Sequence, residues 1–334
     1  MRRVATWLMA ASLGLSLGSL ALPSRADAYC RTRVDGTKAR KNGEPEDGSG
    51  CYGTGNQLFW RSSCISYQLY PAARLVSLNE ARQVVAEAFA KWTQTSCALQ
   101  EEPGKNPDAR ISLDVRDLGE TQCAKAGNPA DKAQSGYNKE GPNQNVIIFR
   151  DAEWPYRKND EGADDQSRTL GLTTVTFDET GEIRDADMEL NTYETKVKVR
   201  DIGPDDYDLA SIITHEAGHF LGIAHSNVDD SSTMYFEYQP GETRKQFLKL
   251  DDINAICEAY APGGIRYSGT QQITAGTCDP TPQGGVQRSC DDEAGGCAAA
   301  PSIGSNAVDT TPFWAATTFA GLGLLVAWRR RKAR

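Results

Sequence analysis

The chain contains only three histidines, and all of them lie within one segment of eleven residues. This segment reads His215-Glu216-Ala217-Gly218-His219-Phe220-Leu221-Gly222-Ile223-Ala224-His225. Histidines four residues apart on a helix project from the same face, so His215 and His219 can share one metal ion. Gly222 is expected to end the helix, because glycine accepts a backbone turn that other residues resist, and the chain then brings His225 to the same point.

These ligands predict zinc, with one Zn²⁺ per chain. Three neutral imidazoles leave a fourth position for water, which is the arrangement of a catalytic zinc site. Glu216 follows the first histidine directly, so it cannot reach the metal but can reach that water, and it is the candidate catalytic base. The alternatives are a structural zinc site and an enzyme that has lost its activity.

The eleven residues resemble the metal-binding motif of the metzincin metalloproteases, and three neighbouring features resemble the matrixin branch of that family. Ser226 follows the third histidine, Met234 fits the Met-turn beneath the metal, and Tyr238 matches the tyrosine that lines the matrixin substrate pocket. One departure is Phe236, which stands where matrixins usually have proline. The resemblance spans roughly residues 63–262.

The resemblance implies an α+β fold of the zincin (metzincin) type. This fold has a twisted, mixed five-stranded sheet with two long helices, an active-site helix, a Met-turn and a C-terminal helix. Hydrophobic periodicity and capping residues agree with it. They predict strands at 65–70, 109–118, 146–149, 170–177 and 183–190, and helices from Ser77 to about Thr95, from Asp208 to about Gly222 and from Leu250.

The resemblance also implies an activity, that of a zinc metalloendopeptidase hydrolysing peptide bonds of extracellular proteins through a zinc-bound water activated by Glu216. Gly171, Leu172 and Thr173 are expected to form the upper edge of the substrate cleft, where an extended peptide adds as a strand. The alternative for this segment is an ordinary sheet strand. A different class of function is a surface adhesin or binding module that keeps the fold without catalysis. The intact Glu216 favours the enzyme.

The amino terminus predicts a secretory signal peptide over residues 1–28. Arg2 and Arg3 precede an uncharged apolar stretch, and Ala26-Asp27-Ala28 offers the small residues of a cleavage site. The alternative is an N-terminal membrane anchor.

The carboxyl terminus predicts a membrane-directed tail. An uncharged stretch from Thr310 to Trp328 precedes a cluster of arginines that should stay cytoplasmic. With Cys297 upstream, the pattern resembles the MYXO-CTERM sorting tail, in which the cysteine is the processing point. The alternative is a plain single-span anchor. The two ends together predict a secreted or cell-surface protein.

The domain boundaries follow from these patterns. We expect a Cys-containing extension at 29–62, the protease domain at 63–264, a Gly/Pro/Thr-rich linker at 265–296 and the tail at 297–334. A net charge of -9 argues against a nucleic-acid partner. The expected partners are a protein or peptide substrate and a membrane, which the chain would contact through its tail. The chain itself is expected to be a monomer.

Two further features concern cross-links and a second metal. Nine cysteines in an exported chain indicate disulfides. Of the many connectivities, the spacing favours Cys97–Cys123, which flank one strand, and the local pair Cys278–Cys290. Cys30–Cys51 and Cys64–Cys257 would complete the set, with Cys297 left for processing. The carboxylates of Asp160, Glu161, Asp164 and Asp165 suit calcium, and the alternative for them is a solvated acidic loop.

Overall fold

The structure is a computed structural model. It describes residues 29–35, 51, 55–71, 75–98, 109–121, 136–137, 139, 142–156, 169–226, 229–286 and 315–319. The predicted signal peptide, the acidic loop at 160–165 and Cys297 lie outside these residues.

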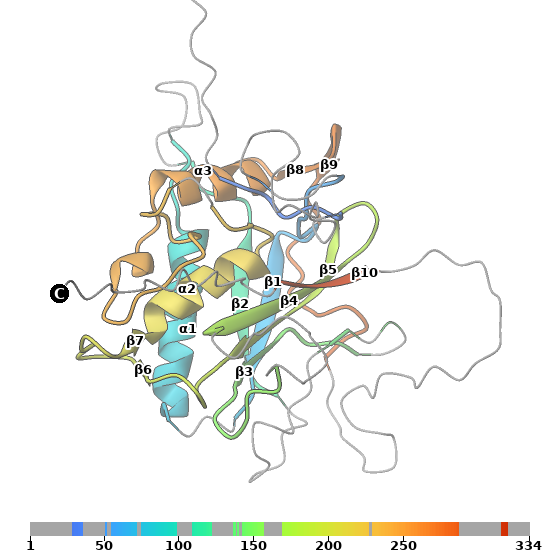
Figure 1. Ribbon diagram of the computed structural model, residues 1–334. Helices are drawn as coiled ribbons and strands as arrows, with labels where there is room; N and C mark the ends of the chain where they lie inside the picture. Colours follow the sequence, from blue (N-terminus) through green and yellow to red (C-terminus); the bar gives the residue numbers. More distant parts are fainter. Residues whose placement is uncertain are drawn as a thin grey trace, which may run out of the picture.

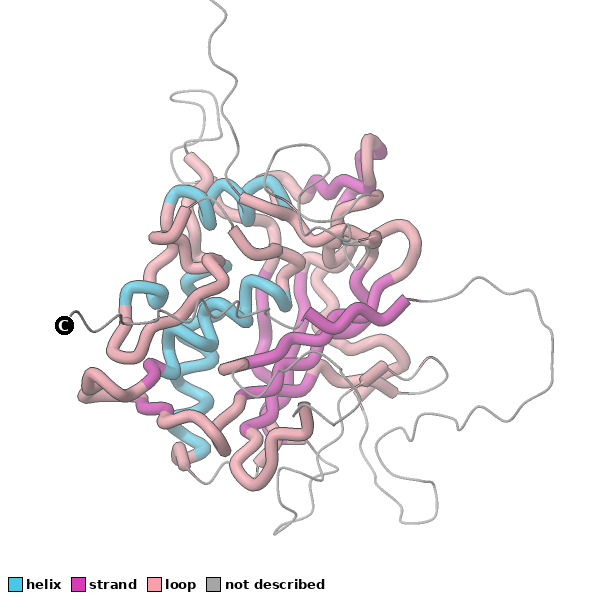
Figure 2. Tube along the Cα trace, viewed as in Figure 1, coloured by secondary structure: helices cyan, strands magenta, loops and turns pink. Residues whose placement is uncertain are grey.

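A mixed sheet forms the centre of the fold, with strand order β10-β4-β5-β3-β1-β2 (Figures 1 and 2). Its strands are β1 (Cys64–Leu69), β2 (Asp114–Glu120), β3 (Val146–Phe149), β4 (Gly171–Phe177), β5 (Ile183–Leu190) and β10 (Ala315–Phe319). Neighbours among β2, β1, β3 and β5 are parallel, whereas β4 is antiparallel to β5. Strands β1 to β5 confirm the predicted mixed five-stranded sheet.

Three helices complete the predicted architecture: α1 (Leu78–Thr93), α2 (Leu209–Phe220) and α3 (Leu250–Ala259). Ser77 caps α1 as predicted, because its hydroxyl accepts the Glu80 N–H at 3.3 Å. Helices α1 and α2 pack against each other on one face of the sheet, and the Trp92 indole of α1 donates to the Thr214 carbonyl of α2 at 2.8 Å (Figure 1). Helix α2, which carries His215 and His219, is thereby held in place by α1, although the two bonded residues are 122 apart in the chain.

The smaller elements are short. They comprise β6 (Val197–Lys198), β7 (Tyr207–Asp208), the 3-10 helix η2 (Arg244–Gln246), and an antiparallel hairpin of β8 (Ile265–Ser268) and β9 (Gln271–Thr274).

The hairpin and the residues after it differ from the expected linker. Arg266 of β8 is fully buried and donates to the Trp60 carbonyl at 3.0 Å and the Ser112 carbonyl at 2.8 Å. Its guanidinium also lies 4.7 Å from the centroid of the Tyr260 ring. The composition of this segment predicts a linker. It gives no sign of the buried Arg266, because the carbonyls that Arg266 binds belong to distant parts of the chain.

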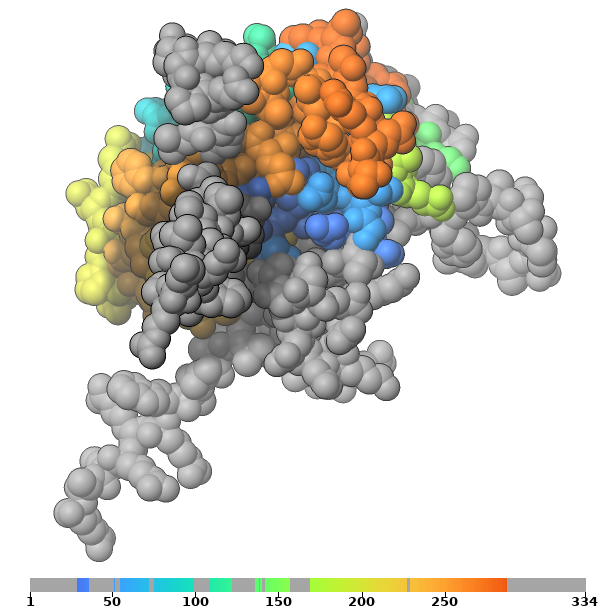
Figure 3. All heavy atoms as spheres, turned by 90° about the horizontal axis from the view of Figure 1, so that it is seen from above, coloured from blue at the N-terminus to red at the C-terminus, as the bar shows by residue number. Residues whose placement is uncertain are grey.

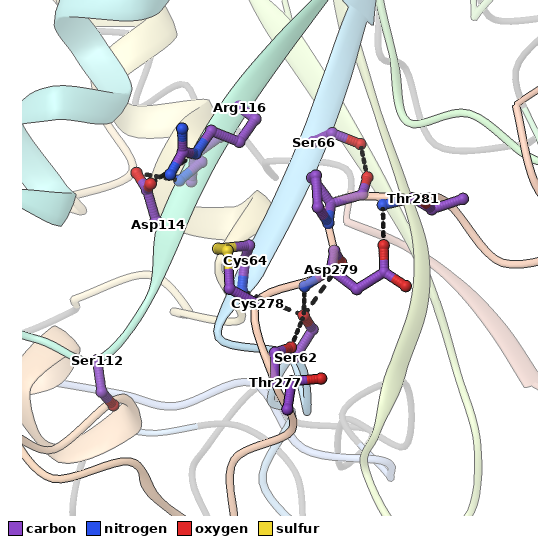
Figure 4. Close-up of a disulfide and its surroundings, with 12 residues drawn as sticks. Ser62, Cys64, Ser66, Ser112, Asp114, Arg116, Thr277, Cys278, Asp279 and Thr281 are labelled. Atoms are coloured by element: carbon purple, nitrogen blue, oxygen red, sulfur yellow. Dashed lines mark hydrogen bonds and ion pairs between the residues drawn. A yellow bond between two sulfur atoms is a disulfide. The ribbon is translucent and has the colours of Figure 1, made fainter.

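Residues after the hairpin run alongside β1, as Figure 4 shows. The Ser66 hydroxyl of β1 donates to the Pro280 carbonyl at 2.5 Å, and a disulfide joins Cys64 to Cys278. The Gly276 N–H donates to the Arg61 carbonyl at 2.8 Å. Asn143 also donates through its main chain and its side chain to the Gln283 carbonyl, so this segment packs on the domain as far as residue 283.

The disulfides correct most of the expected pairs. Cys30–Cys51 forms as predicted. The expected Cys64–Cys257, Cys97–Cys123 and Cys278–Cys290 pairs are wrong, since Cys64 bonds to Cys278 and Cys97 bonds to Cys257. Proximity along the chain suggested the local pairs, but the fold brings together cysteines 214 and 160 residues apart.

Part of the predicted tail forms a sixth strand of the sheet. Ala315–Phe319 pairs antiparallel with β4, so that Phe319 is opposite Thr173 and Ala315 is opposite Phe177. In the part of the chain that the structure describes, no helix has the length and apolar character needed to cross a bilayer.

Candidate metal centre and active site

Helix α2 carries the first two histidines and is buried along almost its whole length. Asp208 caps its start by accepting the Ser211 N–H at 3.0 Å, as the sequence predicts. Gly222 lies just beyond the end of α2 with φ +84°. A Cβ at this position would approach the Leu58 carbonyl oxygen to 3.0 Å, so glycine allows both the turn and the close packing.

The three imidazoles converge on one point. The Nε2 atoms of His219 and His225 are 3.1 Å apart, as are those of His225 and His215. Tetrahedral zinc with Zn–N bonds of 2.0–2.1 Å places its ligand nitrogens roughly 3.3 Å apart. Within the described residues, these histidines form the one cluster of three or more potential ligands. The site therefore fits zinc.

The surroundings favour the form of histidine that binds metal. Burial lowers the pKa of His215 well below its usual value, and it lowers the pKa of His219 to about 4. Each of these rings points Nδ1 at a main-chain carbonyl: His215 at Thr233 (2.7 Å) and His219 at Ile223 (2.9 Å). A neutral ring that donates from Nδ1 directs its Nε2 lone pair at the metal.

Glu216 is buried beside the triad, and strand β4 fixes its carboxylate. The Thr173 hydroxyl donates to Glu216 Oε2 at 2.7 Å, and a Cβ at Gly171 would lie 2.8 Å from Glu216 Oε1. Burial raises the pKa of Glu216 to about 7, a shift that the Thr173 hydrogen bond opposes. Of the three β4 residues predicted to line the cleft, Gly171 and Thr173 thus adjoin Glu216. Leu172 is fully buried, and alternation along the strand points it to the other face.

Met234, the residue predicted for the Met-turn, packs directly against Gly218 of α2. A Cβ added to Gly218 would be 2.3 Å from Met234 Sδ and 2.8 Å from Trp92 Cζ2. Gly218 therefore permits the close approach of the turn to the helix. The sequence reasoning placed Gly218 inside the motif but gave it no role.

Asp252 is a second residue that sequence reasoning missed. Its carboxylate, buried at the start of α3, accepts the Ser232 hydroxyl at 2.5 Å and the main-chain N–H groups of Thr233 (2.8 Å) and Met234 (3.0 Å). The carbonyl of Thr233 is in turn the hydrogen-bond partner of His215 Nδ1. By holding this turn in place, Asp252 therefore orients the ring of the first histidine. An acidic residue in the first turn of a helix is common, so the sequence gives no signal of this role.

Tyr238 and Lys245 flank the triad on the side of the predicted substrate pocket. The Tyr238 ring lies 5.8 Å from the His215 ring, and its hydroxyl donates to the Ser211 carbonyl at 2.5 Å. The Lys245 Nζ lies 4.2 Å from the Tyr238 ring centroid, and burial lowers the pKa of Lys245 to about 8. Phe236 lies with its ring 6.4 Å from that of His225, so this residue, in place of the usual proline, adjoins the third histidine.

Comparison with known proteins agrees with this geometry. The family model for matrixins matches residues 59–261. The chain is 24% identical over 219 residues to Matrix metalloproteinase-C of Caenorhabditis elegans, covering 64% of this chain and 30% of that protein. It is 34% identical over 94 residues to Matrix metalloproteinase-18 of Xenopus laevis, covering 28% and 19%.

A third relative is Neutrophil collagenase of Homo sapiens, which is 37% identical over 76 residues, or 23% of this chain and 16% of that protein. The similarity thus spans less than a third of the length of these relatives. The family match covers more than half of the chain and includes strands β1 to β5, helix α2 and residues 232–235 of the predicted Met-turn. On these grounds the chain belongs to the matrixin family.

Proposed function

We propose that the protein is an exported zinc endopeptidase in which His215, His219 and His225 hold the metal and Glu216 is the catalytic base. The observation that carries this proposal is the convergence of three Nε2 atoms beside a buried carboxylate that is not one of the ligands. The zincin-fold binding module without catalysis is the competing function. It has no need of a buried, hydrogen-bonded Glu216.

The proposed chemistry divides between the metal and Glu216. Zinc, when bound, would lower the pKa of a water molecule and polarise the scissile carbonyl. Glu216 accepts the proton of the attacking water and delivers it to the leaving amine. Its raised pKa, about 7 from burial, suits a group that must both take and release a proton near neutral pH. The Thr173 hydroxyl keeps the carboxylate oriented during both steps.

The test is Glu216→Gln, which preserves size and removes the base. We expect cleavage of casein and of a fluorogenic peptide to fall by about 100-fold or more, while elemental analysis still finds one zinc per chain. Glu179→Gln is the matched control, because Glu179 is exposed on the turn between β4 and β5. A chelator should abolish the activity of the parent protein.

The outcomes separate the two functions. A parent protein that binds zinc but cleaves neither substrate would favour the binding module. Near-parental turnover in Glu216→Gln would exclude Glu216 as the base. Loss of zinc in Glu216→Gln would instead mean that the carboxylate contributes to metal binding.

For the substrate, we propose that an extended peptide pairs with the outer edge of β4 beside Glu216. Main-chain hydrogen bonds along a sheet edge bind a peptide without regard to its side chains. Strand β10 already occupies this edge from Thr173 to Phe177. A substrate at Thr173 therefore competes with the tail, and processing at Cys297 would free the edge.

Deletion of residues 298–334 tests this arrangement. We expect the truncated protein to have a lower KM than the full chain for the same fluorogenic peptide, and to be released into the medium. Cys297→Ala should block processing and retain the higher KM. An unchanged KM after the deletion would argue against competition for the β4 edge.

The remaining proposals concern export and the second metal. Residues 1–28 would direct secretion and the tail would attach the chain to the cell surface or membrane before processing. Calcium near Asp160–Asp165 stays a prediction, which elemental analysis of the same preparations addresses.

A further inference from the structure

The residues that follow the predicted signal peptide contact the active-site loop directly. The Thr32 N–H donates to the Gly222 carbonyl at 3.1 Å, and the Ala224 N–H donates to the Cys30 carbonyl at 2.9 Å. These two bonds flank Ile223, which forms an antiparallel bridge with Arg31. Segment 30–32 is thus paired, main chain to main chain, with the three residues that precede His225.

Ile223 connects this pairing to two of the three histidines. Its carbonyl is the partner of His219 Nδ1 at 2.9 Å. His225 lies two residues after Ile223 in the chain. Fixing the main chain at 222–224 therefore orients the ring of His219 and sets the position from which His225 reaches the other two Nε2 atoms.

The pairing segment is itself held on its other side. The Leu58 N–H donates to the Thr32 carbonyl at 2.8 Å, and the Val34 N–H donates to the Asn56 carbonyl at 2.9 Å. Segment 30–34 therefore lies between the active-site loop and residues 56–58. Figure 3 shows the amino-terminal residues, in blue, bordering the orange carboxyl-terminal part of the domain on the same face.

The side chains of Cys30 and Arg31 also fix the segment. Arg31 is 5% exposed; it donates to the Leu58 carbonyl at 2.5 Å and pairs with Glu258 of α3 at 3.7 Å. A disulfide joins Cys30 to Cys51, and Cys30 is also the residue whose carbonyl accepts the Ala224 N–H. Arg33, by contrast, is bonded through its side chain to the Gly55 carbonyl in an exposed position.

We propose that segment Cys30–Thr32 is a positioning element of the metal site, fixed by Arg31 and the Cys30–Cys51 disulfide, and that it acts on His219 and His225 through the main chain of Gly222–Ala224. The proposal rests on the proposed function for the identity of the metal ligands. The amino-terminal segment is then part of the working enzyme, and its removal does not activate the protein.

The test compares two disulfides and two arginines. Cys30→Ser/Cys51→Ser is expected to weaken zinc binding by about tenfold, the lower end of the range for residues that orient metal ligands. Cys64→Ser/Cys278→Ser is the control, since that disulfide fixes the segment beside β1 and makes no contact with the loop. The zinc Kd is measured by competition with a chromophoric chelator at a temperature where circular dichroism shows each variant folded.

The arginine pair needs no change to a disulfide. Arg31→Gln is expected to weaken zinc binding by about threefold, with Arg33→Gln unchanged and Arg31→Lys intermediate. With Co²⁺ in place of zinc, the visible absorption spectrum of Arg31→Gln should shift because the ligand geometry changes, and that of Arg33→Gln should match the parent. A lower stability alone would leave the Co²⁺ spectrum of the folded protein unchanged.

Parental zinc Kd and Co²⁺ spectra in both Arg31→Gln and Cys30→Ser/Cys51→Ser would overturn this inference while leaving the proposed function intact. If the parent binds no zinc, or if His219→Ala does not weaken binding, the proposed function itself fails. Should Cys30→Ser/Cys51→Ser not fold, the comparison of Arg31→Gln with Arg33→Gln decides the question.

Discussion

The Met-turn and the loop that carries His225 both orient histidines of the triad, yet contacts of different kinds hold them in place. In the Met-turn, the single carboxylate of Asp252 collects the Ser232 hydroxyl and the Thr233 and Met234 N–H groups. In the loop, main-chain bonds with Cys30 and Thr32 fix residues 222–224. The contacts of the Met-turn depend on one side chain, and those of the loop depend on the presence of the neighbouring segment Cys30–Thr32.

The difference predicts where each side of the site is vulnerable. Removal of the Asp252 carboxylate takes the acceptor away from the buried Ser232 hydroxyl and Thr233 N–H, which is costly. No single side chain provides the bonds of the His225 loop, so substitutions there act only by displacing the segment Cys30–Thr32 or by changing the backbone at Gly222. The first side should therefore respond strongly to point mutation, and the second to changes in the amino-terminal segment.

Asp252→Ala should have the largest effect on stability. The Ser232 hydroxyl and the N–H groups of Thr233 and Lys249 would lose their Asp252 acceptor, whereas the Met234 N–H would keep its bond to Ser232 Oγ. We therefore expect a loss of about 3–5 kcal/mol in the free energy of unfolding, measured by urea denaturation of the zinc-loaded protein. Asp252→Asn keeps one acceptor oxygen and should lose less. Asp230→Ala, at an exposed position, serves as the control. A loss below about 1 kcal/mol for Asp252→Ala would contradict the assigned role.

Gly218→Ala should have the next largest effect. The added methyl group overlaps Met234 Sδ, so the turn must move away from α2, at an expected cost of about 2–3 kcal/mol in the free energy of unfolding. Met234→Ala removes the closest overlapping atom and leaves only the contact with Trp92 Cζ2. The double variant Gly218→Ala/Met234→Ala should therefore be more stable than the sum of the two single losses predicts. If the losses in the free energy of unfolding are additive, the added methyl group at position 218 does not clash with Met234.

Gly222→Ala probes the other side and should have the smallest effect of the three. The positive φ and the Leu58 carbonyl at 3.0 Å predict a loss of about 1–2 kcal/mol. Gly263→Ala has a similar φ of +88° but open space around the added Cβ, so it reports the backbone cost alone. Because the Gly222 carbonyl accepts the Thr32 N–H, Gly222→Ala should also weaken zinc binding, whereas Gly263→Ala should not. Equal zinc affinities in the two variants would mean that the backbone of the loop does not affect zinc binding.

Local sequence patterns predicted the elements that make up the site. The Ser77 and Asp208 caps, the apolar run of β3 and the alternation in β5 are all signals contained within a few residues, and the structure has these elements where the sequence predicts them. The spacing of the three histidines is equally local, since a helix and one glycine turn suffice to bring them together. Five strands, three helices and a candidate zinc site could therefore be derived before any tertiary contact was known.

Contacts between distant segments decided the rest. Cys64–Cys278, the burial of Arg266, the collection of donors by Asp252 and the pairing of Cys30–Thr32 with Gly222–Ala224 each join residues that no periodicity relates. Main-chain pairing of this kind carries almost no sequence signature, because any residue supplies the same N–H and C=O groups. The sequence by itself determined which residues can bind zinc and which can take a proton, since this depends on side-chain chemistry and local geometry. Only the tertiary structure determined what keeps those residues in place.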